Sequence, residues 1–77
     1  MRDADAILDA SGLNCPLPVL KTRKSLAALE TGQILKMIST DPGSKADMAA
    51  FAEATGHRLL QSDEKDGRFV FLIEKTS

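Results

Sequence analysis

The residue best suited to chemistry in this 77-residue chain is its only cysteine, Cys15. It lies in the segment Gly12-Leu13-Asn14-Cys15-Pro16-Leu17-Pro18, directly before a stretch, Val19 to Glu30, that has the pattern of an amphipathic helix. A helix N-terminus carries partial positive charge and unpaired backbone N–H groups, so it stabilises an anion and lowers the pKa of a cysteine placed there. The sequence therefore predicts a reactive thiolate at the start of the first helix.

Two prolines restrict the backbone around this cysteine. Proline fixes φ near its helical value, and the residue before a proline favours the extended backbone of an N-cap. Cys15 precedes Pro16 and Leu17 precedes Pro18, so the sequence leaves two helix starts open, with either Cys15 or Leu17 as the cap. Because prolines have no N–H, the donors near the sulfur are reduced to those of Leu17 and Val19. We expect a sulfur held by few donors and open to solvent.

The alternative for Cys15 is a structural role, because a lone cysteine is often buried and packs as a small hydrophobic residue. Core packing gains nothing from a rigid, donor-poor turn at a helix start, so Gly12, Pro16 and Pro18 favour the chemical role and are predicted to shape the site. A single cysteine forms no internal disulfide, which agrees with a reducing compartment.

Composition limits the classes of function. The length predicts one domain, residues 1–77, and 43% hydrophobic with 27% charged residues is typical of globular proteins. A formal net charge of -1 and 4% aromatic residues argue against an electrostatic nucleic-acid binder. The N-terminal stretch from Met1 to Ala6 leads to no apolar signal region, and no later run approaches a bilayer span. We expect a cytoplasmic protein that is monomeric in isolation and has no membrane contact.

The elements that position Cys15 follow from hydrophobic periodicity and turn residues. Strands are predicted at Ile7–Ala10, Gln33–Thr40, His57–Ser62 and Arg68–Lys75, and helices at Val19–Glu30 and Ser44–Thr55. Gly32 and Gly56 are expected to end the helices, Ser44 to cap the second helix, and Asp66-Gly67 to form a hairpin turn. The predicted fold is an α/β (α+β) two-layer sandwich in the order βαβαββ, with two helices on one face of a four-stranded mixed sheet.

The predicted packing also has a consequence for the site. The buried helix faces are expected to consist of Val19, Thr22, Leu26 and Leu29 and of Met48, Phe51, Ala52 and Thr55, and the last strand is expected to be interior. A right-handed crossover makes the first two strands parallel, so the turns that leave them lie at the same edge of the sheet. The loop from Asp41 to Lys45 should then lie near Cys15.

Several short motifs together resemble the TusA/SirA-like family of small sulfurtransferases. They are Leu8-Asp9, Gly12-Leu13, Cys15-Pro16-Leu17-Pro18, Asp41-Pro42, Asp47, Gly56-His57 and Ile73-Glu74-Lys75, and they extend over nearly the whole chain. The resemblance implies a sulfur carrier whose Cys15 takes sulfur as a persulfide from a cysteine desulfurase or rhodanese and passes it to an acceptor protein. It also implies no cofactor. In the family the sulfur serves tRNA thiolation, molybdenum cofactor maturation or sulfur oxidation. The tRNA-thiolation members commonly carry glutamate where this chain has Leu17.

A partner-docking surface is a hypothesis from the charges that follow the cysteine. Lys21, Arg23 and Lys24 lie on the first helix and Lys45 in the loop opposite, where together with the apolar Leu17 they would meet acidic partners. The alternative is an ordinary solvated helix face, since exposed charges on helices are common.

Other polar residues invite a catalytic reading that we weigh against a structural one. An imidazole can activate a thiol, but His57 follows a helix-ending glycine and its spacing indicates no contact with Cys15. Asp41 and Asp47 are predicted as turn and cap residues, and Asp9 as part of a strand-to-turn junction. One cysteine and one histidine predict no metal site.

Two other classes of function stay open. The chain could be a non-catalytic interaction or regulatory module in which Cys15 is incidental, and a Cys15→Ser protein with full activity would favour this. It could also bind RNA, by analogy with the similar sandwich of a translation initiation factor domain. The near-neutral charge and the absence of Tyr and Trp argue against RNA.

Overall fold

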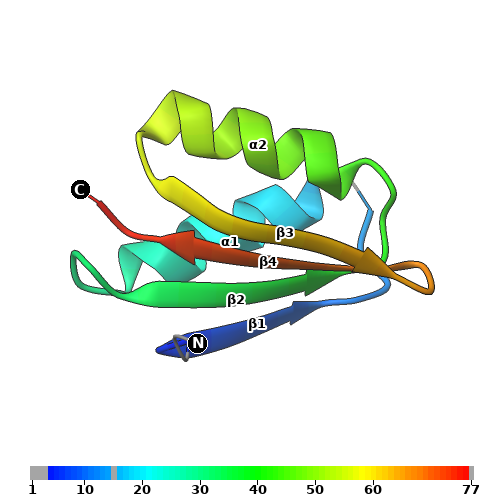
Figure 1. Cartoon of the computed structure of the whole chain (residues 1–77), viewed down its shortest axis with the longest axis horizontal. Helices are drawn as coiled ribbons and strands as arrows, with labels where there is room; N and C mark the ends of the chain where they lie inside the picture. The colour runs from blue at the N-terminus through cyan, green and yellow to red at the C-terminus, as the bar shows by residue number, and fades with distance from the viewer. Residues whose placement is uncertain (1–3, 15, 77) are drawn as a thin grey trace.

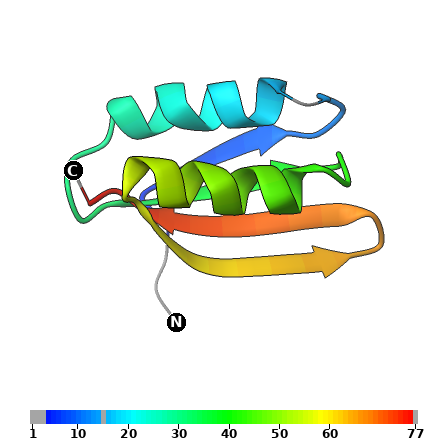
Figure 2. The same cartoon turned by 90° about the horizontal axis from the view of Figure 1, so that it is seen from above.

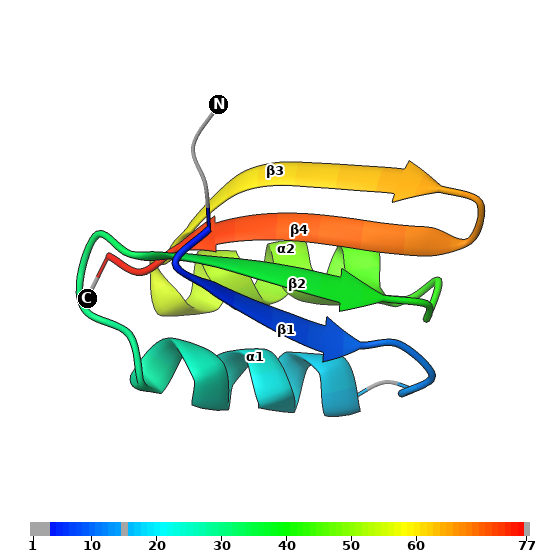
Figure 3. The same ribbon diagram turned by 90° about the horizontal axis from the view of Figure 1, so that it is seen from below.

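The computed structural model describes residues 4–14 and 16–76. Its elements, in chain order, are β1 (Ala6–Ala10), α1 (Leu17–Ala27), β2 (Ile34–Ser39), α2 (Ser44–Thr55), β3 (Arg58–Lys65) and β4 (Arg68–Glu74) (Figure 1). The strands form one sheet in the order β1-β2-β4-β3, in which β1 and β2 are parallel and the other pairs antiparallel. Seen from below, the sheet lies in front of both helices (Figure 3). The predicted βαβαββ sandwich is confirmed.

The core lies between the helices and one face of the sheet. It takes alternate residues from the two central strands, Leu35 and Met37 of β2 and Phe69, Phe71 and Ile73 of β4, against Leu26 of α1 and Met48 and Ala52 of α2. β4 is interior, as predicted, because its apolar residues face both sides of the sheet. Thr55 was expected in the buried stripe of α2, but it is exposed and its hydroxyl donates to the Phe51 carbonyl oxygen at 2.7 Å. Among the described residues, no helix is long and apolar enough to cross a bilayer.

The last two strands form a longer hairpin than the hydrophobic pattern indicates. β3 continues from the predicted end at Ser62 to Lys65, because backbone pairing with β4 holds residues whose polar side chains show no strand pattern. Asp66 and Gly67 form the predicted turn, with φ of 52° and 78°. Positive φ at both central residues is typical of the tight turns that match strand twist.

α1 ends earlier than predicted, at Ala27 rather than near Glu30. The segment after it is held by the C-terminal end of the chain. The Lys75 ammonium donates to the Leu29 carbonyl oxygen at 2.6 Å, and the Gly32 N–H donates to the Lys75 carbonyl oxygen at 2.7 Å. Gly32, with φ of 93°, therefore serves the turn into β2 and does not cap the helix.

Candidate functional site

Cys15 lies outside the described residues, so the site is built from its neighbours in the chain. α1 begins at Leu17 with Pro16 as its N-cap, at φ -97° and ψ 12°, so both predicted starts are wrong by one residue. Leu17 takes helical backbone despite the proline after it. Pro18 then falls in the first turn, where the N–H that proline lacks has no partner within the helix.

The first turn of α1 uses one of the two donors predicted for the sulfur. The Leu17 N–H donates to the Asn14 carbonyl oxygen at 2.9 Å, and the Leu20 N–H donates to the Pro16 carbonyl oxygen at 3.1 Å. Pro18 is buried, and its carbonyl oxygen accepts a hydrogen bond from the buried Thr22 hydroxyl at 2.8 Å. The proline segment is thus fixed to the core at Pro18, while Pro16 and Leu17 are exposed.

The turns that leave β1 and β2 lie side by side, as the parallel pairing predicts. Ala10 pairs with Ser39 at the ends of the two strands, and the Gly12 N–H donates to the Thr40 hydroxyl oxygen at 2.8 Å. Gly12 has φ of 82°, a conformation that suits glycine, so its predicted shaping role has a backbone basis. Both helices begin at this edge (Figure 2).

A hollow of about 330 Å³ lies between the starts of the two helices. It is lined by Pro16 and by Val19 of α1 on one side and by Asp47, Ala50 and Phe51 of α2 on the other. Its surface is mostly apolar, and Asp47 is half-buried at its wall. Pro16, the residue next to Cys15, thus lines the same hollow as residues from the first turns of α2. The sequence predicted Val19 and Phe51 as members of the buried helix faces, but it did not predict that they line a hollow.

The start of α2 is anchored by polar contacts within the loop. Ser44 is not the N-cap as predicted; Gly43 holds that position, and Ser44 is buried with its hydroxyl 2.6 Å from that of Ser39. The Ser39 hydroxyl oxygen also accepts the Asp41 N–H at 3.2 Å, so the buried hydroxyls of Ser39 and Ser44 join the end of β2 to the start of α2. Asp41 accepts a hydrogen bond from the Gly43 N–H at 3.1 Å, which confirms it as a turn residue.

His57 lies at the other end of α2. Its Nδ1 atom accepts a hydrogen bond from the Thr76 N–H at 3.2 Å, and its ring centroid is 6.1 Å from that of Phe51. His57 follows Asp47 by ten residues, most of them in α2. At a rise of 1.5 Å per residue, this places His57 about 15 Å along the helix axis from Asp47. This placement supports the structural role for His57 over a catalytic dyad.

Asp9 forms the predicted junction at the end of β1. Its Oδ1 atom accepts a hydrogen bond from the Ser11 N–H at 3.0 Å. Hydrogen bonds from the Ser11 side chain and backbone lower the pKa of Asp9, and the positive charge of Arg68 adds to the effect. Asp9 thus holds the turn that leads into the cysteine segment.

Comparison with known proteins assigns the chain to a family. The family model described as "Sulfurtransferase TusA" matches residues 6–75. The chain belongs to the TusA family. The sulfur carrier protein TusA of Allochromatium vinosum is 55% identical over 76 residues, which cover 99% of this chain and 100% of the relative.

Further relatives agree with the assignment of this TusA-family chain. The sulfur carrier protein TusA of Pseudomonas putida is 46% identical, over 92% of this chain and 89% of the relative. The crystal structure of a SirA-like protein from Desulfitobacterium hafniense has a TM-score of 0.81 and 30% identity, over 94% of this chain and 99% of that one. The general function is therefore that of a sulfur carrier.

The predicted docking residues of this TusA-family chain all lie on the surface. Leu17, Lys21, Arg23, Lys24 and Lys45 are exposed. The structure adds Leu20 to these surface residues, since it is 52% exposed. Leu17 and Leu20 are three residues apart on α1, so they lie on the same side of the helix and form an apolar pair beside the cysteine segment.

Proposed function

We propose that Cys15 carries sulfur as a persulfide, taken from a protein donor and passed to a protein acceptor. The donor would be a cysteine desulfurase or a rhodanese, and both steps would take place in the cytoplasm. The observation that supports this role best is the position of the Cys-Pro-Leu-Pro segment. Its described residues lie at the exposed sheet edge where both helices begin, beside a hollow that a partner's side chain can enter.

The transfer needs only thiol exchange and no change in overall oxidation state. The Cys15 thiolate attacks the outer sulfur of the donor persulfide, a new S–S bond forms, and the donor's cysteine leaves as a thiolate. In the second step an acceptor thiolate attacks the outer sulfur on Cys15, and Cys15 leaves as a thiolate. Because this chain has no second cysteine, the persulfide cannot discharge as an internal disulfide.

The first turn of α1 suits a negatively charged sulfur beside it. It consists of Leu17, Pro18, Val19 and Leu20, with no acidic residue to offset the positive end of the helix. The exposed Leu17 and Leu20 offer the partner an apolar contact, and Lys21, Arg23 and Lys24 follow with positive charge. We infer that the partner surface around its own reactive cysteine is apolar at the centre and acidic at the rim.

Intact-mass spectrometry tests the proposal. The chain is incubated with a cysteine desulfurase and L-cysteine, and we expect one added sulfur atom that a reductant removes. The Cys15→Ser protein, which differs by one atom, should gain none. A chain that stays unmodified, or a Cys15→Ser protein that is modified equally, would refute the persulfide role.

A further inference from the structure

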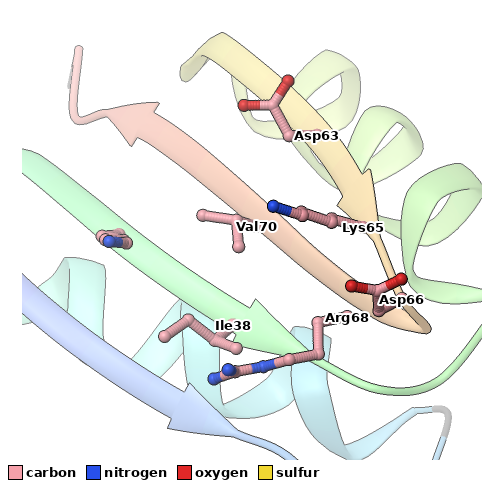
Figure 4. Close-up of a pocket in the computed structure, with 7 residues that line it drawn as sticks. Ile38, Asp63, Lys65, Asp66, Arg68 and Val70 are labelled. Atoms are coloured by element: carbon pink, nitrogen blue, oxygen red, sulfur yellow. The ribbon is translucent and has the colours of Figure 1, made fainter.

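The sheet face away from the helices carries a second hollow, of about 430 Å³. We call it the open-face hollow. Its floor is aliphatic, formed by Ile38 of β2 and Val70 of β4, and three cations surround it: Lys36, Lys65 and Arg68. Figure 4 shows the Lys65 side chain extending toward Val70 and the Arg68 side chain toward Ile38. The charged ends thus lie over an apolar floor.

Two carboxylates complete the lining of the open-face hollow. Asp66 belongs to the hairpin turn, and Asp63 accepts a hydrogen bond from the Gln61 amide. A third, Asp9 on β1, interacts with the charge of Arg68 from the neighbouring edge. The lining has three cations and two carboxylates, and Asp9 adds a third carboxylate beside Arg68, so a ligand gains most from one or two negative groups that reach Lys65 and Arg68 directly.

Two of the cations face each other across the hairpin. Lys65 and Arg68 are directly paired in the antiparallel register of β3 and β4. Like charges at such positions destabilise the pairing of the strands. A negative group bound between Lys65 and Arg68 would attract both side chains. The repulsion between them therefore destabilises the hairpin most when the hollow is empty.

The open-face hollow lies at the same edge of the sheet as the cysteine segment. Phe69, next to Arg68, pairs with Ser39 at the carboxyl end of β2. Ser39 also pairs with Ala10 at the carboxyl end of β1. The hairpin tip and the ends of β1 and β2 point the same way in Figure 3. A protein that reaches the cysteine segment can therefore also reach around this edge to the hollow.

We propose that the open-face hollow binds a short acidic segment with an apolar side chain, supplied by a protein that exchanges sulfur with this chain. The apolar side chain covers Ile38 and Val70, and carboxylates pair with Lys65 and Arg68. That the partner exchanges sulfur rests on the proposed function. A protein segment fits better than RNA, because no aromatic ring lines the hollow for base stacking and Asp63 and Asp66 repel a continuous phosphate chain.

Nuclear magnetic resonance titration of the whole chain tests the binding. The probe is the synthetic peptide Ser-Glu-Leu-Glu-Ser, in which two carboxylates flank one apolar side chain, with Ser-Gln-Leu-Gln-Ser as the control without the two carboxylates. We expect the acidic peptide to shift the amide signals of Lys36, Ile38, Lys65, Arg68 and Val70, and the control to shift them several-fold less. Equal shifts from both peptides, shifts confined to the helices, or stronger shifts from a six-uridine RNA would overturn the proposal.

A charge reversal separates binding from folding. Lys65→Glu places a carboxylate opposite Arg68, so the protein should unfold at the same or a higher temperature than the unchanged chain. The acidic peptide should bind this variant at least several-fold more weakly. Arg58→Glu is the control, because Arg58 lies on the same strand at the far end from the hollow and its side chain is 71% exposed. Unchanged peptide binding by Lys65→Glu, or an equal loss in Arg58→Glu, would contradict the assignment.

The result is independent of the chemistry at the cysteine. The peptide titration is repeated with Cys15→Ser, which should bind as the unchanged chain does. Binding with no persulfide in the mass measurement would refute only the proposed function. A persulfide on Cys15 without peptide binding would refute only the docking site.

Discussion

The two helices begin at the same edge of the sheet, yet their first turns are built differently. α2 starts in a loop held by polar contacts, with the buried hydroxyls of Ser39 and Ser44 in contact and Asp41 accepting the Gly43 N–H. Asp47 adds a carboxylate to its first turn. α1 begins at Leu17, after the N-cap Pro16, and its first turn has no acidic residue; neither Pro16 nor Gly43 caps its helix through a side chain.

This difference in the charge of the first turns fits the proposed function. At α2 the Asp47 carboxylate in the first turn offsets the positive helix end. At α1 the positive end is left for another anion, and the adjacent residue in the sequence is the only cysteine. Under the proposed persulfide role, the same position in the topology serves stability in one case and reactivity in the other.

The largest expected effect comes from breaking the anchored start of α2. Ser44→Ala removes one of two buried hydroxyls in contact, and we expect a loss of about 1–2 kcal/mol in the free energy of unfolding. Urea denaturation measures this loss. Ser62→Ala, at an exposed position on β3, is the control and should change stability little. If the comparison holds, persulfide loading of the folded Ser44→Ala protein is unchanged; slower loading would mean that this start also serves the chemistry.

A smaller effect is expected when α1 is given the acidic residue that α2 has. Leu17→Glu places a carboxylate in the first turn, and we expect it to stabilise the helix by about 0.3–1 kcal/mol relative to Leu17→Gln. The same carboxylate opposes a thiolate at this end, so the thiol of Leu17→Glu should titrate at higher pH than that of Leu17→Gln. Alkylation rates of Cys15 measured against pH compare the two proteins. Identical titration would show that the helix end does not act on the sulfur.

The smallest effect concerns the strand end that leads into the cysteine segment. The pKa of Asp9 is lowered in the folded chain, so its contribution to stability is present above the unfolded value of about 3.9 and is lost as pH falls through the lower folded value. Asp9→Asn should therefore lower the melting temperature slightly at neutral pH. The gap between the two proteins should close as the pH is lowered below 3.9. A difference in melting temperature that stays constant with pH would show that the charge of Asp9 does not contribute to stability.

Much of the site was predictable because its signals are local. The prolines, Gly12 and the strand before them place a cysteine at a strand-to-helix junction, and parallel pairing of the first two strands brings both helix starts to one edge. The predicted bounds of α2 and the hairpin turn at Asp66-Gly67 are confirmed for the same reason. A turn or a cap depends on a few neighbouring residues.

The errors occurred where hydrogen-bond partners outside the local pattern compete for the same groups. Ser44 has the sequence context of an N-cap, but the buried hydroxyl of Ser39 takes its side chain. The pattern of α1 continues to Glu30, yet the chain leaves the helix at Ala27. The Leu29 carbonyl oxygen is bound by Lys75, 46 residues away.

The sequence by itself determined the order of the elements and the position of Cys15 between them, because periodicity, prolines and glycines act over a few residues. Only the tertiary structure decided which groups meet. It brings Pro16 to Phe51 and Asp47 across a hollow, and it gathers Lys36, Lys65 and Arg68 on the open face of the sheet. The physical reason is that strand register and layer packing join residues far apart in the chain, and no local pattern records that pairing.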